Sequence, residues 1–264
     1  MIEHFKKFDN EKGKPMLPLS FSQLNEFAFY RERWALRRIF KYEFPLSASG
    51  VRGNAVESGL NMILNGMDLK DAGEKIMFEF DENCKNINDP KTEDERLNLL
   101  PLLELGAKTF QENAFKWNLL SYQKKVEMEI EGVPFVGYTD FHFEDKNTKE
   151  EFFIDLKTSK NLPLQISTSH AMQQAIYQKA TNAKQILWYL KTPTKTKNAE
   201  FRSMSLDDYI MPYRLCEHIV EVMGNYLASV DSKEEVKNSL IPNPDNWIWK
   251  EPTVLQARKD VWGY

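Results

Sequence analysis

The sequence predicts an α/β protein with a mixed central β-sheet, made of a three-strand meander, a helix and a returning strand, and flanked by helices. Three observations predict this fold class. Apolar residues recur at helical spacing up to about residue 120, alternation typical of strands then replaces that spacing, and one helical pattern separates two strand patterns. We expect a helical N-terminal region and a helical C-terminal extension around this sheet.

A single domain is expected for residues 1–264, because the chain is long enough for one large core and shows no repeat or low-complexity linker. Its 42% hydrophobic and 28% charged residues are ordinary for a globular protein. The domain would consist of a loose arm (1–16), a helical region (17–120), an αβ core (121–191), and a helical extension with a tail (192–264).

The N-terminal region begins with a stretch that has no sustained period, which is typical of a loose arm. Ser20 or Ser22 can then cap a helix that Pro45 stops. Arginines on this helix indicate either a solvated face or one that contacts phosphates; they are Arg31, Arg33, Arg37 and Arg38.

Three further helices are expected before the sheet. The first covers residues 51–64 and ends at Gly66, and the second covers 68–85. The third covers 93–117, with a kink or a boundary at Pro101.

The change of period marks the sheet. Residues 125–130 alternate between apolar and charged side chains, 133–143 are rich in β-branched and aromatic residues, and 151–157 read as a third strand. Gly132 marks the first turn. Three consecutive strands predict an antiparallel meander.

A helix over about 168–180 and a short apolar strand over 185–190 complete the expected core. The remaining sequence is helical by period over 206–230 and 232–240. It ends in a tail over 241–264 that is rich in proline and tryptophan.

Charge and composition restrict the function classes. A net charge of −4 and a pI near 5.7 argue against a surface coated in basic residues, although one basic groove could still attract phosphate. No apolar run is suited to cross a membrane, and the two cysteines, Cys84 and Cys216, cannot form a disulfide framework. We therefore expect a cytoplasmic protein, with both cysteines as buried or idle thiols.

Asp155 and Lys157 lie two residues apart on a predicted strand, so their side chains share one face while Leu156 points the other way. Asp140 lies on the neighbouring strand of the hairpin. Two carboxylates brought together repel each other unless a cation neutralises them, and hard oxygen ligands suit Mg²⁺ or Mn²⁺ rather than zinc. On spacing alone, the alternative is a surface ion pair on an edge strand.

Four motifs occur in order on the expected elements: Gly53-x-x-x-Glu57, Gly137-x-x-Asp140, Ile154-Asp155-Leu156-Lys157-Thr158 and Gln173-x-x-x-Tyr177. With them the chain resembles the RecB-type nucleases of the PD-(D/E)XK superfamily, a group that includes CRISPR-associated exonucleases. The resemblance covers roughly residues 19–190, and it implies that the 121–191 core is catalytic.

The resemblance implies a role for each matching position. Asp140 and Asp155 would be metal ligands together with the backbone carbonyl of Leu156, and Lys157 would be the catalytic lysine. Glu57 falls where many members carry a histidine, and this change to a hard anionic oxygen is consistent with magnesium.

Gln173 and Tyr177 match the family's Gln-to-Tyr motif beside the site, one helical turn apart on one face. Their alternative interpretation is a helix surface residue and a core aromatic. Glu127 matches an acidic residue of some members, but we interpret it as a solvent-facing carboxylate. His142 and His170 fit no family position, so we expect both to be ordinary residues.

Iron–sulfur members of this family place one cysteine near the first helix and three near the C-terminus. Here Tyr30 stands at about the first position, and residues 241–264 contain no cysteine. We therefore expect no iron–sulfur cluster, and we expect the tryptophans of the tail to pin it to the N-terminal helix by packing; they are Trp247, Trp249 and Trp262.

The expected function is a Mg²⁺-dependent deoxyribonuclease, an exonuclease acting on single- or double-stranded DNA ends in recombination, repair or phage DNA processing. It would work in the bacterial cytoplasm, or in the host cytoplasm if a phage encodes it, and a recombination or helicase protein could be its partner. The alternatives are a structure-specific endonuclease and a catalytically silent nucleic-acid-binding protein on the same scaffold. The sequence leaves the oligomeric state open.

Overall fold

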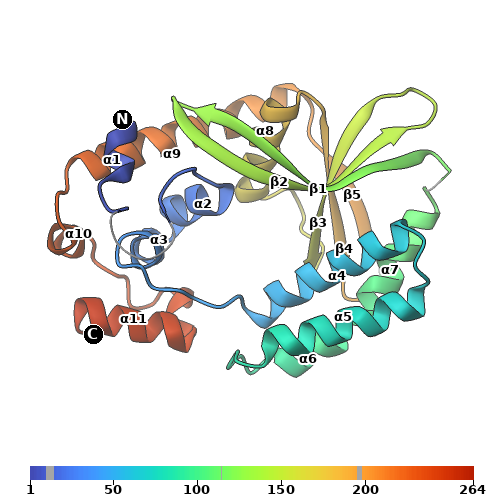
Figure 1. Ribbon diagram of the computed structural model, residues 1–264, viewed down its shortest axis with the longest axis horizontal. Coiled ribbons are helices and arrows are strands. Elements are labelled where there is room, and N and C mark those ends of the chain that lie inside the picture. The colour runs from blue at the N-terminus through green and yellow to red at the C-terminus, as the bar shows by residue number, and fades with distance from the viewer. Residues whose placement is uncertain (10–14, 114, 195–197) are drawn as a thin grey trace. The chain divides into compact units, whose positions relative to one another are not determined.

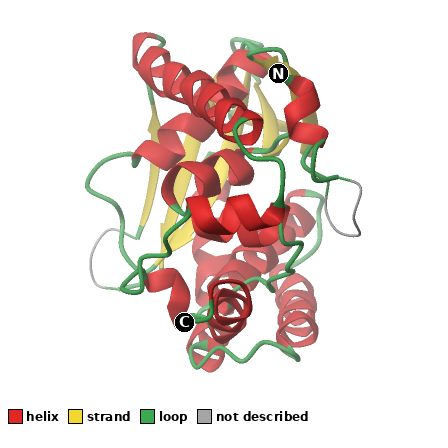
Figure 2. Cartoon of the chain, turned by 90° about the vertical axis from the view of Figure 1, so that its left-hand side faces the viewer, coloured by secondary structure: helices red, strands yellow, loops and turns green. Residues whose placement is uncertain are grey.

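The computed structural model describes residues 1–9, 15–113, 115–194 and 198–264. These residues form two compact units, each with more contacts inside it than outside it. Unit 1 comprises Met1–Phe44, Val126–Gly137 and Tyr209–Tyr264, and unit 2 comprises Pro45–Lys125 and Tyr138–Asp208. Helices make up about half of the described residues (Figure 2).

A five-stranded mixed sheet confirms the predicted fold class (Figure 1). Its strands follow one another in chain order across the sheet. The pairing is antiparallel between β2 and β3, parallel between β3 and β4, and antiparallel between β4 and β5. The strands are β1 (Trp117–Ile130), β2 (Val133–Asp145), β3 (Glu151–Ser159), β4 (Lys184–Lys191) and β5 (Ala199–Ser203).

The turn between β1 and β2 explains why these strands pair as a hairpin. Only Glu131 and Gly132 connect them, and both have positive φ angles, of 51° and 70°. Positive φ at both central residues is the requirement of a type I′ turn, whose twist matches that of antiparallel strands. Gly132 therefore marks the first turn of the predicted meander, as its place in the sequence indicated.

Unit 2 contains the helices that pack on the sheet. Its hydrophobic core joins α4, α5 and α7 to strands β2, β3 and β4 through buried side chains such as Leu60, Phe80, Leu103, Phe141 and Trp188. The helices of this unit are α4 (Ala48–Leu64), α5 (Leu69–Cys84), α6 (Thr92–Leu97), α7 (Leu99–Gln111) and α8 (Thr168–Thr181).

Helix α4 begins where Ser47 accepts a hydrogen bond from the backbone N–H of Gly50, and Gly66 follows its end with φ of 95°. Gly59 lies in the middle of α4 against α5 and α7. A Cβ atom at this position would lie 2.8 Å from side-chain atoms of Ile76 and Leu103. The three helices therefore approach one another as closely as a glycine allows.

The predicted helix over 93–117 is two helices, α6 and α7, separated at Asn98. Pro101 lies in the first turn of α7. Backbone N–H groups there have no acceptor within the helix, so a proline costs no hydrogen bond. The start of the first strand was predicted too late, at residue 125, because Leu119 and Leu120 interrupt the alternation in its first half. Strand β1 begins at Trp117.

Unit 1 holds the remaining helices: α1 (Ile2–Lys6), α2 (Phe21–Phe29), α3 (Arg31–Arg38), α9 (Ile210–Ala228), α10 (Lys233–Ser239) and α11 (Pro252–Trp262). Short 3₁₀ turns cover Asp207–Tyr209 and Trp247–Lys250. The expected single helix after Ser20 is interrupted at Tyr30, and the first residues contain a helix whose Phe5 is fully buried. Part of the expected tail is helix α11.

The tail packs on the N-terminal helices through Trp249 and Trp262, as predicted, whereas the predicted contact of the Trp247 side chain lies outside what the structure describes. Trp249 belongs to a buried cluster with Leu36 of α3, and the ring of Trp262 lies edge-on to Phe40 with centroids 5.8 Å apart. Aromatic pairs of this geometry stabilise a contact beyond the area that they bury.

The arginines of α3 form ion pairs inside unit 1. Glu26 lies 3.6 Å from Arg33 and 3.5 Å from Arg37, and Arg33 also pairs with Glu251. Burial lowers the pKa of the Arg37 and Arg38 guanidinium groups. Within the described residues, this face is partly buried and charge-paired rather than solvated.

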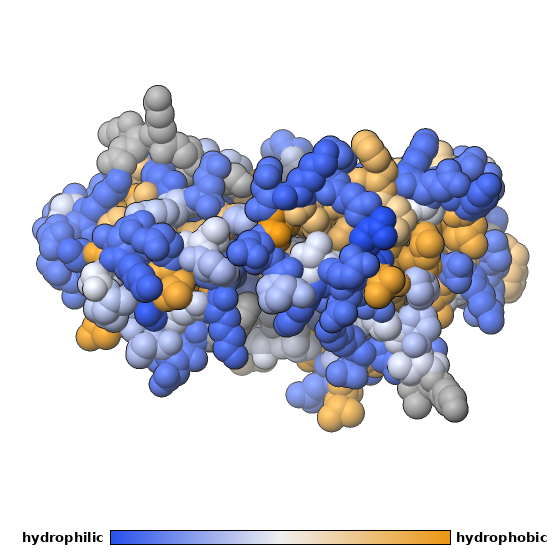
Figure 3. Space-filling view, turned by 90° about the horizontal axis from the view of Figure 1, so that it is seen from below, coloured by the Kyte–Doolittle hydropathy of each residue, from blue (hydrophilic) through white to orange (hydrophobic). Residues whose placement is uncertain are grey.

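The described residues include no helix long and apolar enough to cross a membrane. Hydrophilic side chains predominate on the face shown in Figure 3, with hydrophobic ones scattered among them. Cys84 and Cys216 are buried thiols, as expected.

Candidate active site

Strand β3 carries the two central side chains. Asp155 is only 4% exposed on this middle strand, and the Lys157 ammonium lies 2.5 Å from its Oδ2 atom. Leu156 packs on the other face, in the hydrophobic core of unit 2. The ion pair therefore joins a buried aspartate to a half-buried lysine on the central strand, and the alternative of a surface pair on an edge strand is wrong.

Asp140 reaches the same place from β2. The pairing of β2 with β3 begins at Phe141 opposite Ile154, so Asp140 lies just beyond the paired segment. Its Oδ2 atom accepts a hydrogen bond of 2.8 Å from the backbone N–H of Leu156. A side chain thus takes a backbone donor that a strand partner would otherwise occupy.

Helix α8 supplies an amide that joins the two charges. The Gln173 side chain donates to Asp155 Oδ1 at 3.0 Å, and its Oε1 accepts from the Lys157 ammonium at 3.0 Å. One turn later, the Tyr177 hydroxyl donates to the carbonyl oxygen of Tyr138 on β2 at 3.0 Å. Gln173 and Tyr177 therefore fix α8 to both strands of the site, as their common helix face predicted.

Glu57 of α4 is the third carboxylate. Its Oε1 accepts a hydrogen bond of 3.2 Å from Gln123. Hydrogen bonds from Gln123 and from the Tyr122 hydroxyl lower the pKa of Glu57, against the larger effect of burial. Gln123 has a φ of 49°, which is uncommon for a residue with a side chain. Sequence reasoning identified neither Tyr122 nor Gln123, because no motif marks them and they precede the predicted strand.

The carboxylates of the site repel one another. Burial raises the pKa of Asp140 well above its ordinary value, and the charges of Asp155 and Glu57 raise it further. Burial likewise raises the pKa of Glu57. Burial lowers the pKa of the Lys157 ammonium, but the charges of Asp155 and Asp140 outweigh this effect, so its pKa lies above the ordinary value. Added positive charge would relieve this repulsion.

A buried arginine ties α4 to the end of β3. Arg52 and Glu95 form an ion pair with both side chains no more than 3% exposed. The same guanidinium donates at 3.3 Å to the carbonyl oxygen and to the hydroxyl of Thr158. Since Thr158 follows Lys157, this contact holds the strand beside the lysine in place.

The site residues line a hollow of about 590 Å³ in unit 2. Its wall includes six of the predicted site residues: Glu57, Asp140, Asp155, Leu156, Lys157 and Gln173. Tyr177 does not line the hollow, and its hydroxyl donates to the carbonyl oxygen of Tyr138. His170 also lines the hollow, although it fits no family motif and was expected to be an ordinary residue. Every predicted site residue is therefore in one place or in contact with it.

Two other residues considered from the sequence lie elsewhere. Glu127 is exposed on β1 and is not part of the wall of the hollow. His142 stacks on Phe153 and pairs with Glu151 at 2.8 Å. Glu127 therefore agrees with its interpretation as a solvent-facing carboxylate, and His142 with its interpretation as an ordinary residue.

The chemistry of the site fits a hard divalent cation. Glu57, Asp140 and Asp155 offer only oxygen atoms, and the buried Oδ2 atom of Asp155 has the Lys157 ammonium as its charged neighbour. Across that same part of the chain, no three acidic, histidine or cysteine side chains are arranged to hold a metal ion. Asp140 and Glu57 instead accept hydrogen bonds from the protein.

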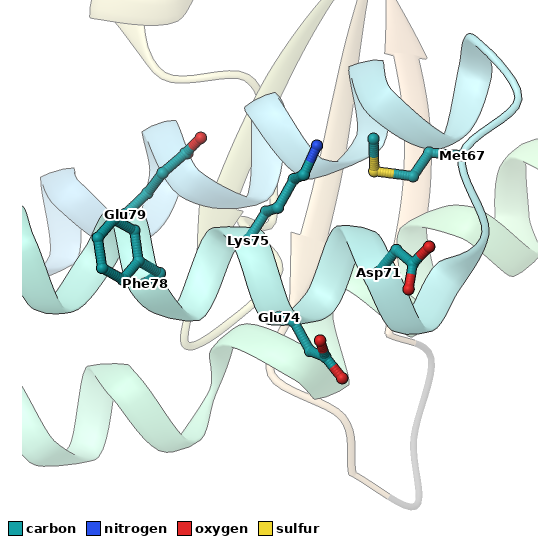
Figure 4. A pocket seen from close by; sticks show the side chains of 6 residues that line it. All are labelled: Met67, Asp71, Glu74, Lys75, Phe78 and Glu79. Carbon is teal, nitrogen blue, oxygen red and sulfur yellow. The ribbon is translucent and has the colours of Figure 1, made fainter.

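A second hollow, of about 570 Å³, lies along α5 and has a different character (Figure 4). Asp71, Glu74, Lys75 and Glu79 point from successive turns of the helix beside Phe78. No lysine–aspartate pair of the kind at β3 is buried there, so the hollow at β3 is the candidate active site.

The chain is also similar to known proteins. The family model of the PD-(D/E)XK nuclease superfamily matches residues 18–239, whereas no curated protein matches the chain. The crystal structure of a candidate exonuclease from Eubacterium rectale is similar with a TM-score of 0.56 and 13% identity, over 94% of this chain and 95% of that one. SSO0001 is similar with a TM-score of 0.34 and 18% identity, over 64% and 84%. At 13% identity, the first likeness concerns the fold.

Proposed function

Because the chain belongs to the PD-(D/E)XK nuclease superfamily, we propose that it is a metal-dependent DNA exonuclease of the RecB type. It would hydrolyse phosphodiester bonds at DNA ends in recombination, repair or phage DNA processing, with a recombination or helicase protein as partner. The observation that carries this proposal is the contact of Asp155, Lys157 and Gln173 within one hollow, beside Asp140.

Lys157 is the catalytic lysine of this proposal. Its ammonium is held between Asp155 and Gln173 and stays protonated at neutral pH, because its pKa is raised. A fixed positive charge in a partly desolvated hollow can orient an attacking water or stabilise the charge that develops on the phosphate.

Glu57, Asp140, Asp155 and the carbonyl of Leu156 would hold one or two Mg²⁺ or Mn²⁺ ions. When bound, such an ion polarises the phosphodiester and lowers the pKa of a water molecule. Oxygen ligands without thiolates favour these metals over zinc. With Tyr30 at the position of the first cluster cysteine, we propose no iron–sulfur cluster.

Mutation of the lysine tests the proposal. In Lys157→Ala, the turnover of linear DNA with Mg²⁺ should fall on the order of 100-fold or more, while DNA affinity changes little. Lys184→Ala, which removes an exposed lysine of β4, is the control and should cut like the wild type. Wild-type turnover in Lys157→Ala would exclude the proposed role.

The preference for ends is tested with two substrates of the same sequence. A linear duplex should be digested, and a covalently closed circle should persist. Digestion of the circle would favour a structure-specific endonuclease. We favour an exonuclease over an endonuclease, in keeping with the description of the Eubacterium rectale protein as a candidate exonuclease.

A silent nucleic-acid-binding protein on this scaffold is the remaining alternative. DNA binding without cleavage over a range of Mg²⁺ and Mn²⁺ concentrations would favour it. The contact between Lys157 and Asp155 argues against it, because a scaffold that only binds has no need of a buried carboxylate held against an ammonium.

A further inference from the structure

The wall of the hollow contains a histidine and a tyrosine that the proposed reaction leaves without a role. His170 lies in the first turn of α8, and its Nδ1 atom is 2.8 Å from the hydroxyl of Tyr189 on β4. Tyr189 is the register partner of Lys157 on the parallel strand, so both side chains project from one face of the sheet. The pair therefore belongs to the same hollow as the lysine.

The hydroxyl of Tyr189 is the donor in this hydrogen bond. Tyr189 is 1% exposed, and burial raises its pKa to about 12, so the phenol keeps its proton at neutral pH. Within the described ranges, His170 Nδ1 is the only partner recorded for that hydroxyl. A buried hydroxyl proton without an acceptor is costly, so it points at Nδ1.

The protonation state of His170 follows from this direction. Burial lowers the pKa of His170 to about 4, and the neighbouring charge of Lys157 acts in the same sense, so the ring is neutral at pH 7. A neutral imidazole carries one proton, and since Nδ1 accepts, that proton is on Nε2. No hydrogen bond from Nε2 is recorded to any residue that the structure describes.

The surroundings of the pair keep it in place. The guanidinium of Arg202 on β5 lies 5.6 Å from the centre of the Tyr189 ring and donates at 2.6 Å to the carbonyl oxygen of Pro163. Pro163 belongs to the segment between β3 and α8 and also lines the hollow. Arg202 thus contacts both the Tyr189 ring and the segment at Pro163 that lines the hollow.

We propose that His170 is a phosphate-binding residue, which donates a hydrogen bond from Nε2 to an oxygen of the nucleic-acid backbone, and that Tyr189 is the positioning residue that keeps its tautomer. This inference rests on the proposed function, because it takes the hollow to hold a phosphodiester. With its proton on Nε2, His170 cannot ligate a metal through that atom. A neutral donor adds no further positive charge beside Lys157.

Two substitutions of His170 separate this role from a structural one. The side-chain amide of His170→Gln can place an N–H donor near the position of Nε2, whereas that of His170→Asn places it near Nδ1. Binding of a linear duplex is measured by fluorescence anisotropy with Ca²⁺ in place of Mg²⁺. His170→Asn should bind about 10- to 100-fold more weakly, because a hydrogen bond to a charged oxygen is lost. His170→Gln should stay within about threefold of the wild type.

The tautomer is measured directly by NMR of ¹⁵N-histidine-labelled protein, with the His170 signal assigned by its loss in His170→Gln. We expect Nε2–H in the wild type and a mixture of tautomers in Tyr189→Phe. Tyr226→Phe, which removes a hydroxyl bonded to Ser239 in unit 1, is the control and should leave the His170 signal unchanged.

The outcomes are distinct. A wild type that binds DNA without cutting it contradicts the nuclease proposal, while the comparison of His170 variants still decides the inference. Equal affinity in His170→Asn, His170→Gln and the wild type overturns the inference. So does a wild-type ring protonated on Nδ1, or a wild type that binds no DNA.

Discussion

Gln173 joins the two opposite charges of the site through a single amide. Its nitrogen donates to Asp155 and its oxygen accepts from Lys157, each at 3.0 Å. An amide can satisfy both partners at once because it carries a donor and an acceptor at fixed separation. Gln173 therefore positions the ammonium relative to the carboxylate.

Removal of this amide should affect turnover more than binding. Gln173→Ala should lower kcat about 10- to 100-fold with a small change in KM, because the lysine loses one of its two anchors. Steady-state digestion of linear DNA measures both constants. Gln178→Ala, on the same helix and outside the site, is the matched control. A raised KM with wild-type kcat would mean that Gln173 contacts the ground-state substrate instead.

The site residues differ in how far the sequence could reveal them. Alternation on a strand places Asp155 and Lys157 on one face, and helical spacing does the same for Gln173 and Tyr177. Tyr122 gave no such signal, because its place depends on which helix packs beside its strand, and no local pattern specifies that. His170 lies three residues before Gln173 and therefore shares its helix face, but no motif marked it.

The buried guanidinium of Arg52 joins helix α4, helix α6 and strand β3. Arg52 of α4 pairs with Glu95 of α6 and donates to Thr158 of β3. Removing one member of a buried pair leaves the other charge without a partner in a medium that solvates it poorly. The three elements therefore depend on both partners.

Truncation of Glu95 should be strongly destabilising. Glu95→Ala should cost about 3–5 kcal/mol of unfolding free energy, and each kcal/mol corresponds to about 2–4 °C in Tm for a protein of this size class. Thermal unfolding followed by circular dichroism gives the comparison. Glu93→Ala, two residues earlier and exposed, should change Tm little. Similar losses in the two variants would contradict the importance of the buried pair.

Elements with a long, regular pattern were predictable, and those that depend on their neighbours were not. Helices α4 and α8 and strands β2 and β3 agree with the sequence within a few residues. Strand β5 was missed because its five residues, Ala199–Ser203, form no recognisable period and gain their order by pairing with β4. Helix α11 was not predicted because the prolines of the tail favoured irregular structure. One of them, Pro252, instead occupies the first turn of the helix, where a proline is tolerated.

The stability of the whole protein should respond to pH through Asp140. Its pKa is raised in the folded state by burial and by Asp155 and Glu57. A raised carboxyl pKa contributes stability that is complete below the unfolded value of 3.8 and is lost as pH rises through the folded value. Without divalent metal, this contribution therefore declines from about pH 4 towards neutrality.

Asp140→Asn removes that titration while keeping an oxygen that can accept from Leu156. With a chelator present, the variant should have a higher Tm than the wild type at pH 7–8 and a similar Tm near pH 4. Added Mg²⁺ should raise the Tm of the wild type more than that of the variant. Parallel Tm curves across this pH range would contradict the repulsion among the carboxylates.

Gly59 links the packed hydrophobic core of unit 2 to the candidate active site. A methyl group there would act as a wedge, since it would press on Ile76 and Leu103 at 2.8 Å. Glu57 stands half a turn upstream on the same helix, so any tilt of α4 that relieves the pressure also displaces an acid of the site. The absence of a Cβ atom at Gly59 thus lets α4 keep the position that places the Glu57 carboxylate in the site.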